Sequence, residues 1–226
     1  MDSRGHDMET VHIKSSQSGV GRCGYLFVKR FFDIVLSASA LIVLMPVFLV
    51  IACLIKREDH GPVFYRHERL GIHGKRISVY KFRSMKPGSD DLTLLTSEQL
   101  REYYGEFKIA NDPRVTKVGV GLRQKFLDEL PQLINILRGE MSFVGPRPIM
   151  EEELLRHYLE WERQKFLSMK PGLTGYWQLC ARDRATYESG ERQRAELFYI
   201  DNAGFWLAVK IMWRTALMML SKKRGA

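Results

Sequence analysis

The sequence predicts a helix-rich α+β protein within the broad α/β class, with a small mixed domain behind a hydrophobic helical segment. Three features support this fold class. Residues 34–55 form a run of 22 residues without a charge. Two β-rich runs, 61–71 and 75–85, are joined by only three residues, which is typical of a hairpin. Residues 130–137 place leucine and isoleucine at helical spacing, so a helix is expected there.

Length and charge limit the classes of protein that fit. At 226 residues the chain can form one domain with a substantial core plus accessory segments. Its 35 Lys and Arg outnumber 26 Asp and Glu, and a formal net charge of +9 suits an anionic partner such as nucleic acid, a phosphorylated substrate or lipid headgroups. The three cysteines are widely spaced, so they indicate neither a disulfide framework nor a zinc site.

The first part of the chain divides into a leader and a membrane segment. Residues 1–24 are polar and rich in Gly and Ser, so we expect a mobile leader. Residues 25–58 contain the uncharged run, which would reach about 33 Å as a straight helix and so matches a bilayer core. Pro46 lies near its middle and should break the helix, because proline lacks an N–H and its ring clashes with the preceding turn.

Two topologies are open for this segment. Basic pairs flank it on both sides, and the positive-inside rule then places both ends in the cytoplasm: Lys29 with Arg30, and Lys56 with Arg57. Together with Pro46, this predicts a re-entrant helix–break–helix that enters and leaves one leaflet. From this segment alone, a single span with a proline kink fits nearly as well.

Residues 59–226 are expected to form a cytoplasmic domain. A helix should start at Thr96, which can form a capping box with Gln99. Residues 111–119 predict a turn and a short strand, and the turn at Pro171 should lead into a short aromatic strand. The hairpin is basic, although such residues usually form a solvated, charged sheet face: Arg66, Arg69, Lys75, Lys81 and Arg83.

The last apolar segment, residues 203–220, carries only two charges, Lys210 and Arg214, one helical turn apart on the same face. Its aromatic residues and the basic tail that follows favour a helix lying at the membrane interface. A buried core helix is a fair alternative. A second membrane span is less favoured because both charges would fall inside it.

Two adjacent acids, Asp128 and Glu129, precede a helix expected from near Pro131 to Gly139. Anions are favoured at a helix N-terminus, so capping worth about 0.5–2 kcal/mol is the ordinary interpretation of such acids. Arg147 lies between two prolines in the motif GPRP, whose stiffness can hold a guanidinium ready to bind phosphate. An exposed arginine in a structural turn is the plain alternative.

Taken together, the motifs resemble the bacterial sugar transferases, also called monotopic phosphoglycosyl transferases. The resemblance covers about residues 25–223, and the pair DELPQL and VGPRP is its most specific part. It implies an α/β catalytic unit seated on amphipathic helices, with a re-entrant N-terminal hairpin. Its blocks occur in order along the chain: KRFFDIVLSASALIVLMPVFLVIACLIK, GPVFYRHERLG, YKFRSM, NDPRVTKVG, LDELPQLINILRGEMSFVGPRP, KPGLTGYWQL and ELFYIDN.

The resemblance also implies an activity at the cytoplasmic face of a bacterial inner membrane. Such enzymes transfer a sugar 1-phosphate from a UDP-sugar to undecaprenyl phosphate and release UMP, using Mg²⁺ and a covalent phosphosugar intermediate. This step starts the synthesis of exopolysaccharide, capsule, O-antigen or protein glycans. Membrane lipids are then further partners, family members often form homodimers, and no nucleic-acid binding is expected.

The resemblance assigns roles to individual residues. Asp128 matches the nucleophile and a metal ligand, and Glu129 matches its partner in the dyad. Two arginines match phosphate-binding positions, Arg147 and, after the Gly-Thr-Gly strand region, Arg182. A basic bowl would include Lys81 and Arg83, and Pro46 matches the break in the membrane helix. One departure adjoins the dyad, where the family usually has a small hydroxyl residue and this chain has Lys125-Phe126-Leu127.

Two other functions fit the same residues. A membrane-anchored scaffold would use the acids only as a helix cap and its basic face to bind lipid headgroups or RNA. A metal-dependent hydrolase of diphosphates would use the same acids with water as the acceptor. The sequence does not select the donor sugar, because discrimination between hydroxyl and acetamido groups depends on loop geometry.

Overall fold

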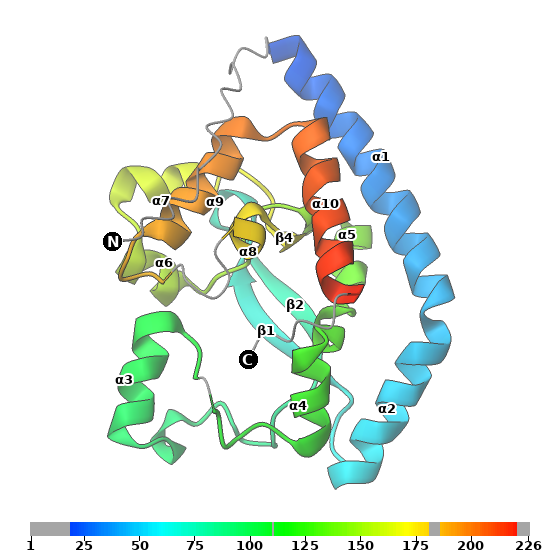
Figure 1. Ribbon diagram of the computed structural model, residues 1–226, viewed down its shortest axis with the longest axis vertical. Helices are drawn as coiled ribbons and strands as arrows, with labels where there is room; N and C mark the ends of the chain where they lie inside the picture. The colour runs from blue at the N-terminus through cyan, green and yellow to red at the C-terminus, as the bar shows by residue number, and fades with distance from the viewer. Residues whose placement is uncertain (1–18, 110, 181–185, 221–226) are drawn as a thin grey trace, which may run out of the picture.

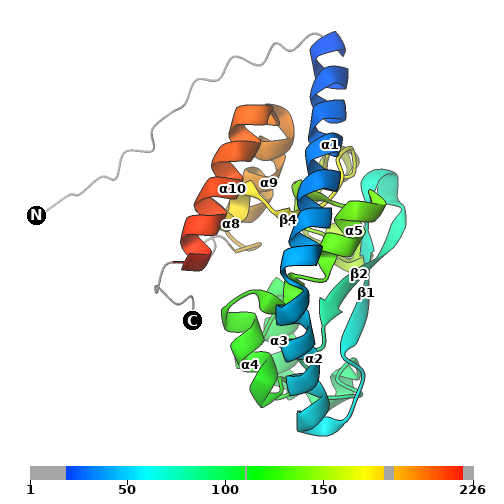
Figure 2. The same ribbon diagram turned by 90° about the vertical axis from the view of Figure 1, so that its right-hand side faces the viewer.

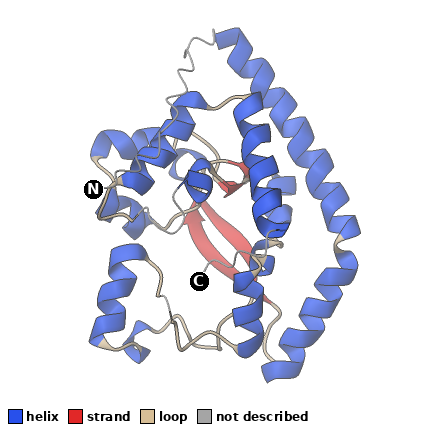
Figure 3. Cartoon of the chain, viewed as in Figure 1, coloured by secondary structure: helices blue, strands red, loops and turns tan. Residues whose placement is uncertain are grey.

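The computed structural model describes residues 19–109, 111–180 and 186–220. Its fold is helix-rich α+β, as the sequence predicts, with short strands at the centre and helices around them (Figure 1 and Figure 3). Residues 1–18 of the predicted leader lie outside the described residues. The first helix begins at Gly19, inside the range that the sequence assigns to the leader.

Two N-terminal helices, α1 (Gly19–Val43) and α2 (Met45–Asp59), run along one side of the molecule (Figure 2). They are bent by 59° at Leu44, and Pro46 lies in the first turn of α2, where its missing N–H is tolerated. The predicted helix break is therefore confirmed. Among the described residues, no single helix is long and apolar enough to cross a bilayer, whereas this bent pair meets both criteria when its halves are taken together.

Helix α1 presents polar side chains to the rest of the protein. Arg30 donates from Nη1 to the carbonyl oxygen of Ile136 at 2.6 Å and from Nη2 to that of Leu137 at 2.8 Å. The carboxylate of Asp33 accepts hydrogen bonds from the Ser142 hydroxyl and the Phe143 backbone N–H, each at 3.1 Å. Elsewhere α1 and α2 expose large apolar side chains, among them Leu26, Phe27, Phe31, Ile42, Val43, Met45, Leu49 and Val50.

The predicted hairpin is confirmed. Strands β1 (Phe64–Leu70) and β2 (Arg76–Phe82) pair antiparallel across a 3₁₀ turn at Ile72–Gly74. Helix α5 (Gln132–Arg138) packs on β2 and ends at Gly139, as predicted. Gly139 has a φ of 81° and lies against the Arg30 guanidinium. Glycine suits this position because it readily adopts a positive φ and has no Cβ atom to approach the guanidinium. The shared core contains Ile77, Val79, Leu133, Ile136 and Met141.

The remaining helices complete the shell around the strands. The capping box that the sequence predicts between Thr96 and Gln99 is present at the start of α3, with both of its hydrogen bonds formed. The bounds of these helices are α3 (Ser97–Glu106), α4 (Lys117–Gln124), α6 (Glu151–His157), α7 (Glu160–Phe166) and α9 (Glu191–Asn202).

Two predicted strands differ from the observed structure. Residues 111–119 form only an isolated bridge, from Val115 to Met85, before α4 begins. After Pro171, strand β4 (Gly172–Thr174) pairs parallel with β3 (Ser142–Val144), and the aromatic residues fall instead in helix α8 (Tyr176–Cys180). The strand cannot continue because its partner β3 ends where the proline-containing turn begins.

The C-terminal helix α10 (Phe205–Leu220) is amphipathic, as predicted, and begins two residues later than expected. Ala208 and Ile211 are buried against the domain, so α10 is packed on it along one side. Phe205, Trp206 and Trp213 are exposed. A helix that packs one face on the protein and exposes aromatic residues on another is typical of helices that lie at a membrane interface.

The contacts of Arg30 lead to a prediction about stability. Because Arg30 satisfies two carbonyls at the C-terminal end of α5, Arg30→Gln should lower the free energy of unfolding by about 2 kcal/mol. Chemical denaturation of the detergent-solubilised protein measures this. The control is Arg57→Gln, since Arg57 is exposed on α2 and its substitution should change the value by less than about 0.5 kcal/mol. Equal values for both variants would contradict a docking role for Arg30.

Candidate active site

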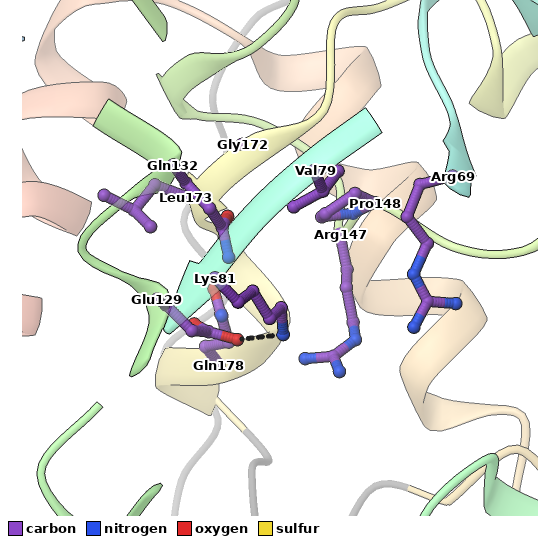
Figure 4. Close-up of a pocket in the computed structure, with 10 residues that line it drawn as sticks. All are labelled: Arg69, Val79, Lys81, Glu129, Gln132, Arg147, Pro148, Gly172, Leu173 and Gln178. Carbon is purple, nitrogen blue, oxygen red and sulfur yellow. Dashed lines mark hydrogen bonds and ion pairs between the residues drawn. The ribbon is translucent and has the colours of Figure 1, made fainter. Parts of the chain in front are cut away.

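A polar pocket lies between the hairpin, the acidic turn before α5 and the proline turn after β3. Figure 4 shows the side chains of Glu129, Lys81, Arg147 and Arg69 pointing to the same side. We call this space the basic pocket, since three of these four side chains are cationic. Its complete lining is Arg69, Val79, Lys81, Glu129, Gln132, Arg147, Pro148, Gly172, Leu173 and Gln178.

An ion pair joins the acidic turn to the hairpin. Lys81 on β2 donates from Nζ to Oε1 of Glu129 at 3.0 Å, and both side chains are about one-fifth exposed. Each charge is thus partly shielded from water, which strengthens the attraction relative to a surface pair. The structure therefore brings together two of the residues predicted for the site.

Asn135 on α5 sets the distance between these two segments. Its side chain is completely buried, and its amide nitrogen donates to the Ser78 carbonyl at 2.8 Å and to Glu140 Oε2 at 2.6 Å. Its amide oxygen accepts from the Tyr80 N–H at 3.0 Å. The side chain of Asn135 thus bonds to the backbone of β2 as a neighbouring strand would, which fixes Lys81 opposite Glu129.

Asp128 lies beside Glu129 in a 3₁₀ turn (Leu127–Glu129), just before α5 as predicted. The turn follows Phe126, whose φ of 57° is unusual for a residue with a bulky side chain and redirects the chain there. Asp128 is only 8% exposed and is not part of the pocket lining. Burial first, and then the charge of Glu129, raise the pKa of the Asp128 carboxyl, whereas Lys81 and Arg123 act to lower it.

Arg147 enters the basic pocket from the turn after β3. Its position depends on a close crossing of two backbones, because a Cβ atom at Gly172 would lie 2.1 Å from the Gly145 nitrogen. Only glycine permits this contact, which explains why glycines recur in both motifs. The Arg147 guanidinium lies 5.7 Å from the ring centroid of Trp177 on α8, within range of a cation–π interaction.

A buried carboxyl supports this turn from behind. Oε1 of Glu196, on α9, accepts a hydrogen bond from the Arg147 backbone N–H at 3.0 Å. Burial raises the pKa of Glu196 to about 7, although this hydrogen bond and the charges of Arg192 and Arg147 oppose the shift. Glu196 begins the block ELFYIDN, but the sequence assigned it no role, because its partner is 49 positions away in the chain.

The structure separates Arg83 from the basic pocket. Its guanidinium forms a buried ion pair with Asp59 at the end of α2, and its Nε donates to the Pro62 carbonyl at 2.6 Å. These contacts place Arg83 in the joint between α2 and β2 and not in the predicted basic bowl. Arg182 lies outside the described residues, so its role stays a prediction. Arg69, which the sequence places on a solvated sheet face, instead lines the pocket.

The sequence model of the bacterial sugar transferases matches residues 24–222, and the chain belongs to that family. Three similar proteins illustrate the family. The undecaprenyl-phosphate galactose phosphotransferase of Salmonella typhimurium is 39% identical over 221 residues, which cover 96% of this chain and 45% of that protein. The exopolysaccharide production protein ExoY of Rhizobium meliloti is 39% identical over 191 residues, 83% of each chain.

The third relative is the UDP-glucose:undecaprenyl-phosphate glucose-1-phosphate transferase of Escherichia coli. It is 40% identical over 203 residues, which cover 88% of this chain and 40% of that protein. The chain thus spans under half the length of two of these three relatives, and most of the length of ExoY.

The buried carboxyl of Glu196 leads to a pH-dependent prediction. Its pKa is raised in the folded state, so its contribution to stability is full below its ordinary value of 4.5 and is lost as the pH rises through about 7. Glu196→Gln, which mimics the protonated acid, should remove this dependence. At pH 8 the variant should have a free energy of unfolding higher than the wild type by about 3 kcal/mol.

Denaturation curves between pH 4.5 and 8 measure this difference. Glu191→Gln is the matched control, since Glu191 is an exposed residue on the same helix and its substitution should leave the pH profile unchanged. A Glu196→Gln profile parallel to that of the wild type would mean that Glu196 is ionised throughout this range.

Proposed function

We propose that this protein transfers a sugar 1-phosphate from a UDP-sugar to undecaprenyl phosphate and releases UMP. Its curated relatives include a galactose phosphotransferase and a glucose-1-phosphate transferase that are named for undecaprenyl phosphate. The observation that carries the proposal is the convergence of Glu129, Lys81 and Arg147 on one pocket beside the buried Asp128. Cations next to a shielded carboxylate are the groups that phosphoryl transfer to a protein acid needs.

The proposed reaction has two displacements at the same phosphorus. A carboxylate oxygen of Asp128 attacks the β-phosphorus of the UDP-sugar, and the bond from that phosphorus to the bridging oxygen breaks, so UMP leaves. An oxygen of undecaprenyl phosphate then attacks the phosphorus of the aspartyl phosphosugar. The bond to Asp128 breaks, the carboxylate is regenerated, and the product is a lipid-linked diphosphosugar.

The residues of the pocket have separate tasks in this proposal. Lys81 and Arg147 offset the negative charge of the phosphate oxygens when the phosphate approaches the Asp128 carboxylate. Burial of Asp128 removes water that would otherwise solvate the nucleophile or compete with the acceptor. Glu129 holds Lys81 in place through their ion pair. The negative charge of Glu129 also raises the pKa of Asp128, and so affects the reactivity of the nucleophile.

Mg²⁺ fits this site as a cofactor bound jointly with substrate. No group of three or more possible ligands occurs among the described residues, but Mg²⁺ is commonly held by one or two carboxylates together with substrate phosphates. Burial first, and then the charge of Glu129, raise the pKa of Asp128, so a cation beside these two carboxyls would be favourable. Asp128, with Glu129 beside it, would hold the ion, which would neutralise charge on the diphosphate.

The exposed apolar helices support a membrane location for the proposed reaction. The exposed apolar side chains of α1, α2 and α10 would contact lipids of the cytoplasmic leaflet of a bacterial inner membrane. The acceptor is itself a membrane lipid, so the pocket would open near its phosphate. The product would serve as the start of an exopolysaccharide, capsule, O-antigen or glycoprotein glycan, and nucleic acid has no part in this function.

Substitution of Asp128 tests the proposed reaction. Asp128→Asn should abolish both UMP release and capture of a labelled phosphosugar on the protein, because an amide cannot act as the nucleophile. A panel of UDP-sugars with undecaprenyl phosphate and Mg²⁺ is the assay, and the panel also identifies the donor. Asp201→Asn, at an exposed position on α9, is the control and should retain activity. Persistent turnover by Asp128→Asn would reject this nucleophile.

The same assay separates the two alternatives. A diphosphate hydrolase would release free sugar phosphate without undecaprenyl phosphate, whereas a transferase needs that acceptor for multiple turnover. A membrane scaffold would give no UMP, and chelation of Mg²⁺ would change nothing.

We further propose a re-entrant topology for α1 and α2, which cysteine labelling tests. Cys23 can report on one flank and a His60→Cys variant on the other, each as the single cysteine in its chain. A membrane-impermeant maleimide should label neither site in intact cells and both sites after lysis. Labelling of either flank from outside would contradict the re-entrant topology, and labelling of one flank alone is the result expected for a kinked span.

A further inference from the structure

Arg69 differs from the other basic residues of β1. Along this strand Arg66 and Glu68 are exposed, whereas the side chain of Arg69 is only 12% exposed and lines the basic pocket. Figure 4 shows its guanidinium on the same side of the pocket as the Lys81 ammonium and the Arg147 guanidinium. Burying a guanidinium requires partners for its donors, so the contacts of Arg69 indicate its task.

Those contacts leave Arg69 incompletely satisfied. Its Nη2 lies 3.2 Å from Nδ1 of His67, and its Nη1 lies 3.7 Å from Oε2 of Glu153, which is an ion pair beyond hydrogen-bond distance. Nη1 is buried and, within the described part of the chain, has no hydrogen-bond partner. An unmet buried donor is costly, and more so when it is charged.

Glu153 cannot fully neutralise Arg69. Its Oε1 accepts a hydrogen bond from Arg192 at 3.1 Å and another from the hydroxyl of Tyr187, and its Oε2 accepts from the Met150 backbone N–H at 3.4 Å. One carboxylate is thus shared by two arginines. The positive charge of Arg69 is therefore available to an anion in the basic pocket.

The pKa of the neighbouring residue His67 is also affected by these positive charges. Burial first, and then the charges of Arg69, Lys81 and Arg147, lower the pKa of His67 to about 3. His67 is consequently neutral, so its Nδ1 can accept the hydrogen bond from Arg69. Three cations and one acid, Glu129, line the pocket beside this imidazole, so its surroundings favour an anion.

We propose that Arg69 binds a substrate phosphate group in the basic pocket that its guanidinium lines. This inference rests on the proposed function, because it names a further binding residue of the same pocket. A guanidinium suits this task, since it can donate two parallel hydrogen bonds to one phosphate. The phosphate belongs either to the nucleotide sugar or to the polyprenyl acceptor, and the two sources have separate kinetic signatures.

Steady-state kinetics distinguish the two sources. Arg69→Gln should raise KM at least tenfold for the substrate whose phosphate Arg69 binds, as expected for loss of a hydrogen bond to a charged group. A rise confined to the UDP-sugar identifies the donor, and one confined to undecaprenyl phosphate identifies the acceptor. Arg69→Lys keeps the charge without the paired donors and should give a smaller rise. Arg66→Gln, on the exposed face of the same strand, should leave both KM values unchanged.

A purely structural role would give a different result. It would lower the melting temperature and kcat of Arg69→Gln with both KM values within twofold of the wild type, and that outcome overturns the proposal. If Arg69→Gln does not fold, the same criterion applies to Arg69→Lys.

Calorimetry with inorganic pyrophosphate keeps this inference distinct from the proposed function. Wild-type protein should bind pyrophosphate at least tenfold more tightly than the folded Arg69 variant, whether or not any UDP-sugar is turned over. Absence of UMP release with this difference intact would refute the transferase and retain the phosphate site. Equal pyrophosphate binding by both proteins would refute the role of Arg69.

Discussion

The hydrogen bonds from the Asn135 side chain to β2 hold the two sides of the basic pocket together. One buried amide satisfies the Ser78 carbonyl and the Tyr80 N–H and so joins α5 to the outer edge of the hairpin. The acidic turn precedes α5, and Lys81 directly follows Tyr80. These hydrogen bonds therefore determine whether Glu129 and Lys81 come into contact. Loss of either hydrogen bond would be costly, because the freed donor or acceptor would be buried with neither a protein partner nor water.

Around this joint the charges form two layers. Lys81, Arg147 and Arg69 face the basic pocket, while Glu153 and Glu196 lie behind the arginines and accept their hydrogen bonds or pair with them. Arg192 packs at 4.7 Å from the Trp177 ring and 4.0 Å from the Tyr187 ring. The rear acids and aromatic rings orient the cations without cancelling them, which leaves a net positive surface towards the substrate side.

Local patterns in the sequence predicted the elements that depend on local physics. Thr96 and Gln99 form their capping box, Gly139 ends α5, and Pro46 breaks the N-terminal helix, because each effect acts within about one turn of the chain. The prediction of an aromatic strand after Pro171 was wrong in its extent, since a strand does form there but ends before the aromatic residues, where β3 also ends. Arg83 was predicted to line the site and Arg69 was not, yet Arg83 pairs with Asp59 and Arg69 lines the pocket. Such differences arise from partners far away in the chain.

The polar residues of α1 also bear on how the protein is made. Lys29, Arg30, Asp33 and Ser37 lie on a helix whose other side chains are largely apolar, and Asp33 and Ser37 are buried in the folded protein. In hydrocarbon, without Ser142 and the end of α5 beside them, Arg30 and Asp33 would lose their hydrogen-bond partners outside α1, and insertion would be costly. Helix α1 is therefore poorly suited to enter a bilayer during synthesis ahead of the domain that follows it. In the re-entrant topology proposed above, insertion of α1 would therefore follow folding of the domain, when the partners of these groups are in place.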